Sequence, residues 1–184
     1  MVIINLAYTA PINPPGAAPV LNAEQVWMGL QYKVRRADKF VPVITACEVL
    51  SESSLENENI ADSEQSEPRV VTRRVTFRAD RPGFKEGSGD GRSGHDVKEV
   101  CKLYAPCRID FLQEDGSTIG NYVSRGPVGE LMMTYVFEWR VPGVQKNSER
   151  ARDLEEHYSK MAKMAVEGSI ETIRKIVKGE VVMD

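Results

Sequence analysis

The chain has 184 residues, a formal net charge of −3 and 41% hydrophobic residues. This length fits one domain, residues 1–184, with a substantial core, and the absence of a basic block in the sequence argues against nucleic acid as a partner. No apolar run approaches the roughly 18 residues that a membrane-spanning helix needs, and the apolar start at 1–6 lacks the positive leader of a signal peptide.

The cysteine and histidine content argues against a metal site. The sequence has an odd number of cysteines, without C-x-x-C spacing: Cys47, Cys101 and Cys107. It has only two histidines, His95 and His157. A Cys/His zinc site is therefore not expected, and reduced thiols in a cytoplasmic protein are the simplest interpretation.

Helical sequence follows a first β-rich segment. Val2–Tyr8 is predicted to be a strand, which the Asn13-Pro14-Pro15-Gly16 break ends. A helix from Asn22 to about Arg36 is predicted by an apolar face and by a capping-box pattern in which Gln25 stands three residues after Asn22. A second short helix over Ala37–Phe40 stays open, because four residues cannot settle it.

The middle of the chain is predicted to be β-sheet. Six segments have β-rich or alternating sequence and are separated by turn signals, among them the Asp115-Gly116 pair of a tight hairpin. These predicted strands are Val43–Leu50, Arg69–Arg78, Val97–Tyr104, Arg108–Gln113, Thr118–Ser124 and Gly129–Val141.

Two segments between these strands are predicted to be flexible loops. Residues 52–68 are acidic and polar, and residues 80–96 hold five of the fourteen glycines. The glycine run 87–91 lacks the Lys-Ser/Thr of a P-loop and opens no helix, so no nucleotide or other cofactor is expected.

The C-terminal stretch Ser148–Lys178 is predicted to be one long helix. Ser148 is suited to the N-cap position and Gly179 follows the last turn. One apolar stripe is expected to face the rest of the protein, and it consists of Leu154, Met161, Ala165, Ile170, Ile173 and Val177.

This order of elements predicts an α+β fold. Short turns between consecutive strands favour antiparallel pairing, and a long amphipathic helix needs a broad apolar surface. We expect a seven-stranded antiparallel curved sheet wrapped around the C-terminal helix, with one or two short helices after the first strand.

Several motifs spread over nearly the whole chain resemble a known superfamily. They are Asn13-Pro14-Pro15-Gly16, Gln25-Val26-Trp27, Phe40-Val41-Pro42, the segment 72–77, Asp115-Gly116-Ser117-Thr118, the segment 131–139, and Met161-Ala162-Lys163 with Ile170 in the last helix. The chain is similar to the START / birch-pollen-allergen-like (SRPBCC) superfamily, which has the helix-grip fold, and within it to a fungal AtaL-like branch.

The resemblance implies a hydrophobic cavity between sheet and long helix. Members of the superfamily carry lipids, hormones or metabolites, and some catalyse cyclisation or condensation. The fungal branch is similar to proteins of natural-product gene clusters, which implies a polyketide-, peptide- or terpenoid-derived ligand.

Strand alternation places two charged residues on the inner face of the sheet. Arg73 shares a face with Val71, Val75 and Phe77, and Glu99 lies on the more apolar face of the next strand. A pair between them is expected because an unpaired buried charge is costly. The pair could be structural, or Arg73 could bind a ligand carboxylate or enolate while Glu99 acts as acid or base.

Tyr135 is the third candidate catalytic residue, as a phenol that faces the cavity. For each aromatic residue ordinary core packing is the more common role, although a buried Tyr or Trp still needs a hydrogen-bond partner. The predicted ligand-binding residues are Trp27, Cys101, Asn121, Met133, Phe137, Trp139, Met161 and Ala165.

Three functions are compatible with these features. The first is a cofactor-free cavity protein that binds a hydrophobic or amphipathic metabolite and folds it for cyclisation or isomerisation. The second is a carrier or storage protein without turnover, and the third is an interaction module that uses the acidic loop. The sequence leaves open whether the protein is an enzyme, which ligand it takes and whether it forms a homodimer.

Overall fold

Two layers, a sheet and a long helix, make up the computed structural model, which describes residues 1–53, 69–78 and 95–183. Ten elements follow one another in the predicted order. They are β1 (Val2–Pro11), α1 (Ala23–Arg35), α2 (Ala37–Phe40), β2 (Ile44–Ser53), β3 (Val70–Phe77), β4 (His95–Tyr104), β5 (Arg108–Gln113), β6 (Thr118–Arg125), β7 (Leu131–Val141) and α3 (Glu149–Val177).

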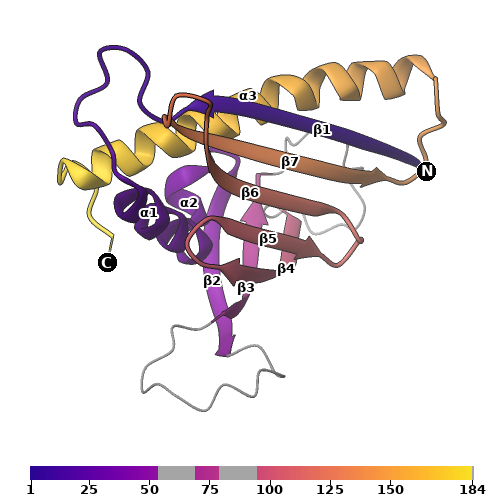
Figure 1. Ribbon diagram of the computed structural model, residues 1–184. Helices are drawn as coiled ribbons and strands as arrows, with labels where there is room; N and C mark the ends of the chain where they lie inside the picture. Colours follow the sequence, from indigo (N-terminus) through magenta and orange to yellow (C-terminus); the bar gives the residue numbers. More distant parts are fainter. Residues whose placement is uncertain (54–68, 79–94, 184) are drawn as a thin grey trace, which may run out of the picture.

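The seven strands form one antiparallel sheet in the order β1-β7-β6-β5-β4-β3-β2. The first strand pairs with the last, from Val2 opposite Val141 to Pro11 opposite Met132. Since β1 and β2 occupy opposite edges, the segment with α1 and α2 carries the chain from one edge to the other (Figure 1). This arrangement confirms the predicted helix-grip fold.

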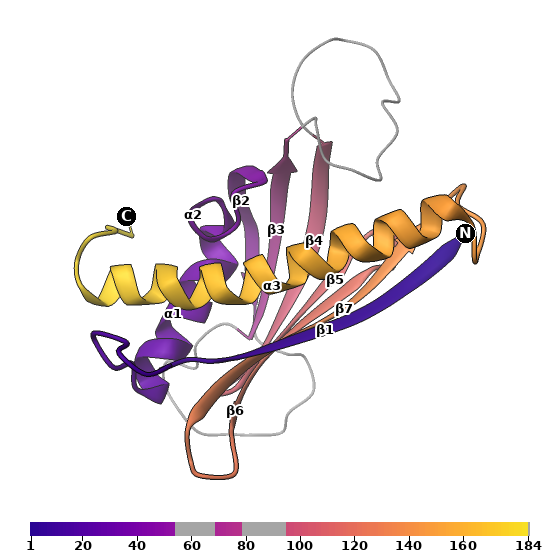
Figure 2. The same ribbon diagram turned by 90° about the horizontal axis from the view of Figure 1, so that it is seen from above.

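Helix α3 lies across the fan of strands, and α1 and α2 lie beside its C-terminal half (Figure 2). It begins at the predicted N-cap, where the Ser148 hydroxyl accepts a hydrogen bond from the Ala151 N–H. Helix α1 begins with the predicted capping box, in which the side chains and backbone N–H groups of Asn22 and Gln25 bond reciprocally. The short α2, which the sequence left open, is present.

The buried face of α3 differs from the predicted stripe. Met161, Ala165 and Val177 are half-buried at its flank, whereas Leu154, Ile170 and Ile173 are buried as expected. Ala151, Tyr158, Val166 and Arg174 are buried although the predicted stripe does not contain them. The buried residues of α3 are Ala151, Leu154, Tyr158, Ala162, Val166, Ser169, Ile170, Ile173 and Arg174.

The two segments predicted to be loops contain strand residues at the ends that can be described. Glu52 belongs to β2 and pairs with Val71, and Asp96 belongs to β4 and accepts a hydrogen bond from the Thr76 hydroxyl at 2.6 Å. Polar residues on the exposed face of a strand look like loop sequence, which explains the error. The rest of both predicted loops, residues 54–68 and 79–94, lies outside the described residues.

The predicted Asp-Gly turn joins β5 to β6. Gly116 has a φ of +82°, a conformation that favours glycine, and the Asp115 carboxylate accepts a hydrogen bond from the Ser117 N–H.

A tight contact between α1 and α3 gives a first prediction. A Cβ atom on Gly29 would lie 2.4 Å from Ile173, whereas a Cβ on Gly168 of α3 would meet no atom within 4 Å. Gly29→Ala should therefore lower the free energy of unfolding by about 1–3 kcal/mol. Gly168→Ala, the matched control, should raise it by about 0.5–1 kcal/mol through helix propensity. Urea unfolding measures both, and equal effects of the two substitutions would show that the α1–α3 contact is not tightly packed.

Candidate functional site

Buried polar side chains from six elements meet between the inner face of the sheet and the helices. We call them the interior polar cluster. They are Lys33 of α1, Arg73 of β3, Glu99 of β4, Asn121 of β6, Tyr135 of β7 and Ser169 of α3, each of them 6% exposed or less. Groups of this kind are rarely buried without partners, so their contacts define what the site can do.

Arg73 and Glu99 form an ion pair because they lie directly opposite each other on β3 and β4. Both Nε and Nη2 of Arg73 donate to Glu99 Oε2, at 2.8 and 2.6 Å. Nη1 of Arg73 donates to the backbone carbonyls of Lys33 and Val34, at 2.8 and 2.7 Å. The other carboxylate oxygen of Glu99 accepts a hydrogen bond from the Gln113 side chain.

These contacts confirm that Arg73 and Glu99 point inward and pair. Four hydrogen bonds already use most of the N–H groups of Arg73, and both carboxylate oxygens of Glu99 have donors. The pair connects the last turn of α1 to the sheet. The geometry thus favours the structural alternative, and the catalytic roles of both residues stay predictions.

Lys33 is a member of the cluster that the sequence analysis missed. Its side chain is 6% exposed, and its Nζ lies 4.0 Å from the centre of the Tyr135 ring and 5.8 Å from that of Phe111. The sequence signal was available, because Lys33 stands within the apolar stripe of α1, three residues after Leu30 and next to Val34. A charge inside an apolar stripe indicates a buried cation.

Lys33 is the buried cation that does not form an ion pair with Glu99. Two cations, Lys33 and Arg73, share one carboxylate, Glu99, and Arg73 takes it. A guanidinium does not lose its proton in proteins, so the amine is the group that can become neutral. Burial, and then the positive charge of Arg73, lower the pKa of Lys33 to about 7, although Glu99 and the Cys101 thiol oppose the shift.

Asn121, Tyr135 and Ser169 form the part of the cluster with free hydrogen-bonding capacity. Asn121 lies beside Tyr135 in the β6–β7 register. Neither amide atom of Asn121, nor the hydroxyls of Tyr135 and Ser169, has a well-formed hydrogen bond with any described residue. Burial raises the pKa of Tyr135, which the nearby Ser169 hydroxyl partly opposes, so the phenol stays protonated. These atoms could bind a carbonyl or hydroxyl group of a ligand.

The other predicted ligand-binding residues divide into two groups. Cys101, Met133, Phe137 and Trp139 are buried on the inner face of the sheet. The Phe137 and Trp139 rings stack at 4.5 Å, and Tyr158 of α3 extends the stack. Burial raises the pKa of the Cys101 thiol to about 12, which makes it a poor nucleophile.

Trp27, Met161 and Ala165 form the second group, and they lie half-buried at the margin of the core. All three pack against the hydrophobic cluster that contains Tyr135. Nothing in it tests whether they touch a ligand, and that role stays a prediction.

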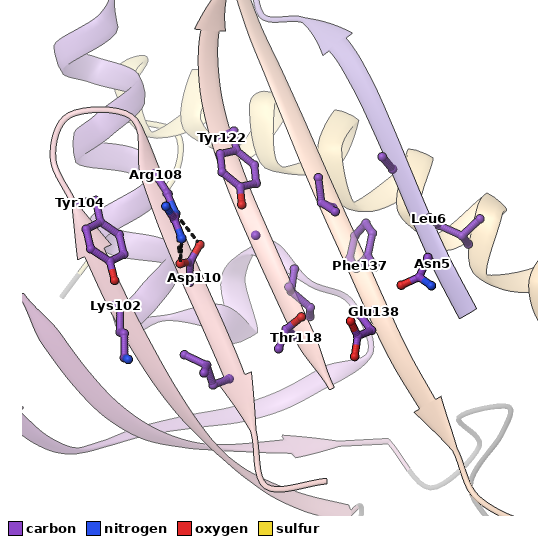
Figure 3. Close-up of a pocket in the computed structure, with 15 residues that line it drawn as sticks. Asn5, Leu6, Lys102, Tyr104, Arg108, Asp110, Thr118, Tyr122, Phe137 and Glu138 are labelled. Atoms are coloured by element: carbon purple, nitrogen blue, oxygen red, sulfur yellow. Dashed lines mark hydrogen bonds and ion pairs between the residues drawn. The ribbon is translucent and has the colours of Figure 1, made fainter. Parts of the chain in front are cut away.

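A separate hollow lies on the outer face of the sheet, on the side away from α3 (Figure 3). Its volume is about 700 Å³, and side chains of β1, β4, β5, β6 and β7 line it. Arg108 forms an ion pair with Asp110 there and lies 4.7 Å from the centre of the Tyr104 ring. None of the predicted catalytic residues lines this hollow.

The sequence of this chain matches a family model described as acetylaranotin biosynthesis cluster protein L, AtaL, over residues 6–180. The chain belongs to the AtaL family. A relative of that name from Aspergillus terreus is 28% identical over 171 residues, which are 93% of this chain and 88% of the relative. The predicted resemblance to the fungal branch is thereby confirmed.

Solved structures similar to this AtaL-family protein have the helix-grip fold. The ZhuI aromatase/cyclase from Streptomyces sp. R1128 aligns with a TM-score of 0.59 and 14% identity over 96% of both chains. The di-domain aromatase/cyclase StfQ of the steffimycin pathway has the same TM-score at 8% identity, over 97% of this chain and 51% of its own. Ara h 8.0201 aligns with a TM-score of 0.52 and 10% identity, over 97% and 99%. At these identities the likeness shows the fold alone.

The remaining predictions concern the surroundings of this AtaL-family protein. No helix in the described ranges combines the length and apolar character needed to cross a membrane. Cytoplasmic location, the lack of a metal or cofactor, the lack of a nucleic-acid partner and the open homodimer question stay predictions.

The Arg73–Glu99 pair gives a second prediction. Arg73→Met should lower the free energy of unfolding by about 3–5 kcal/mol, because it leaves Glu99 buried without its cation and removes the N–H donors that two α1 carbonyls share. Arg74→Met is the matched control on the same strand. Arg74 forms an exposed pair with Glu48, so its loss should cost less than about 1 kcal/mol. Chemical denaturation measures the loss in free energy of unfolding for both variants. A small loss for Arg73→Met as well as for Arg74→Met would contradict a structural role of the buried pair.

The lowered pKa of Lys33 gives a third prediction. Between pH 7 and about 10 the unfolded chain carries a proton on Lys33 that the folded protein lacks, so this residue makes stability rise with pH. Lys33→Met removes that contribution. The stability advantage of the variant over the original protein should therefore be largest at pH 7 and shrink by up to roughly 1 kcal/mol per pH unit above it. Denaturant titrations at several pH values test this, with exposed Lys160→Met as control. A difference that does not change with pH would contradict the lowered pKa.

Proposed function

We propose that this AtaL-family protein binds an amphipathic small molecule between the inner face of its sheet and α3, and folds it for cofactor-independent cyclisation or isomerisation in natural-product biosynthesis. One observation carries the proposal. The buried amide of Asn121 has no partner among the described residues, and the neighbouring hydroxyls of Tyr135 and Ser169 have no well-formed hydrogen bond there. Leaving such groups unpaired costs about 1–3 kcal/mol each, and a ligand with polar groups would recover that cost.

The surroundings of these atoms fit an apolar ligand body. Phe111, Met133 and Phe137 are buried on the same face of the sheet, and each is 5% exposed or less. Apolar walls with a few fixed polar groups are typical of small-molecule sites. The family relative from a biosynthesis cluster supports a metabolite as the ligand.

Each polar group has a role in this proposal. The protonated Tyr135 hydroxyl donates a hydrogen bond to a ligand oxygen and stabilises the negative charge that develops there during enolisation. Asn121 fixes the orientation of the same ligand group. Arg73 and Glu99 hold α1 against the sheet and so keep the site in shape.

A carrier without turnover is the second candidate. It is favoured by the saturated Arg73–Glu99 pair, which leaves neither residue free to act on a ligand. One experiment distinguishes the two functions: a carrier releases its ligand chemically unchanged after prolonged incubation, whereas an enzyme converts it. The interaction module relied on the acidic segment, of which residues 54–68 lie outside the described residues.

Two ligands of matched shape test the site. 2-Naphthol should bind more tightly than 2-methylnaphthalene, because its hydroxyl can pair with the free polar atoms. Asn121→Leu should remove roughly a fivefold to tenfold preference and raise the free energy of unfolding by about 1 kcal/mol, since it removes a buried amide without partners. Calorimetric titration and denaturation measure the two effects.

Asn5→Leu is the matched control, since Asn5 lines the outer hollow. It should leave both affinities unchanged. A loss of binding in Asn5→Leu alone would move the ligand site to the outer face of the sheet, and equal binding of both ligands to the original protein would contradict the role of the polar atoms.

A further inference from the structure

The amine of Lys33 is buried next to the polar atoms of the proposed ligand site. It lies over the Tyr135 ring, and Tyr135 in turn adjoins the amide of Asn121 and the hydroxyl of Ser169. The Nζ of Lys33 has no hydrogen bond or ion pair with a residue in the described ranges, since its neighbour Arg73 occupies the nearby carboxylate. A buried amine without an anion has little reason to keep its proton.

We propose that Lys33 forms a reversible imine with a ligand carbonyl, so that the ligand class is a ketone or 1,3-diketone with an apolar body. This inference rests on the proposed function, because it places the reacting carbonyl in the same site. It adds a covalent step and a substrate class to that function.

The step balances without an oxidant, reductant or cofactor. The lone pair of the neutral Lys33 nitrogen attacks the carbonyl carbon and gives a carbinolamine. That intermediate then loses its oxygen as water, which carries away the two hydrogens of the amine. A carbon–nitrogen double bond replaces the carbon–oxygen double bond, and hydrolysis reverses the step.

The neighbours of Lys33 suit the two stages. The Tyr135 hydroxyl, which burial keeps protonated, can donate to the carbonyl oxygen as it becomes negative and can then help it to leave as water. The Asn121 amide has free donors and an acceptor for a second ligand oxygen, which a 1,3-diketone supplies. Because the pKa of Lys33 is lowered to about 7, a substantial fraction of the amine is unprotonated at pH 7 and has a free lone pair.

Other nucleophiles near the site are less suited. The Cys101 thiol is protonated near neutral pH because its pKa is raised to about 12, and Arg73 remains charged. Lys160, which is exposed and pairs with Glu156, serves as the internal reference.

Labelling with two diketones tests the inference on the full chain. Acetylacetone serves as a small probe, and benzoylacetone as a probe with an aromatic body. After treatment at pH 7, borohydride reduction and peptide mass mapping locate each modified lysine. We expect both probes to modify Lys33 at least about tenfold more than Lys160. The mass gain should equal the probe minus water for the conjugated adduct, and two hydrogens more where borohydride has reduced it.

Two variants and one matched ligand make the result decisive. Lys33→Met should abolish the labelling and keep the fold, as checked by circular dichroism, and Lys160→Met should leave the labelling of Lys33 intact. The 1,3-diol that corresponds to benzoylacetone should bind without modifying the protein.

The outcomes separate the inference from the proposed function. If benzoylacetone and its diol bind and Lys33 is labelled no more than Lys160, the imine is overturned while the binding function stands. If acetylacetone labels Lys33 selectively but neither larger compound binds, the reactive amine stands and the proposed ligand site falls. If neither probe labels Lys33 selectively and nothing binds, both are overturned.

Discussion

The buried ion pair of Arg73 with Glu99 determines which other groups in the interior can carry a charge. The guanidinium bridges two layers, since it holds the carboxylate of β4 and two carbonyl oxygens at the end of α1. It thereby fixes α1 against the sheet and occupies Glu99, the one carboxylate near Lys33 in the part of the chain that the structure describes. A pair of this kind contributes little net stability compared with apolar packing, but the loss of either partner is costly. Its main effect is to fix the position of α1 on the sheet. This leaves the Lys33 amine without an ion-pair partner among the described residues.

The interior therefore contains two kinds of polar group with different consequences. Arg73, Glu99 and Gln113 satisfy one another and behave as structure. Asn121, Tyr135 and Ser169 retain hydrogen-bonding capacity that the described residues do not use. A core shaped only for stability would replace these groups with apolar ones, so their presence indicates that something else selects them. The helix-grip fold supplies the setting, because the sheet curves around α3 and brings residues of β6, β7 and α3 together.

The order of elements and the inward direction of Arg73 and Glu99 follow from the sequence, because strand alternation and turn residues are local properties. The capping box at Asn22 and the N-cap at Ser148 follow for the same reason. The roles of residues were harder to predict. Arg73 looked like a ligand-binding cation, yet the α1 carbonyls that occupy it come from a distant part of the chain. Met161 and Ala165 looked central, yet both are only half-buried.

The sequence by itself determined the fold, since a period of two in the strands and of about 3.6 in the helices decides which residues face inward. It also determined that a positive and a negative charge face each other on β3 and β4. Only the tertiary structure decided which of two buried cations keeps the carboxylate. Lys33, Arg73 and Glu99 lie on three elements, and the electrostatic energy of each depends on distances across layers that no local pattern encodes. For that reason the lowered pKa of Lys33 follows only from the three-dimensional arrangement.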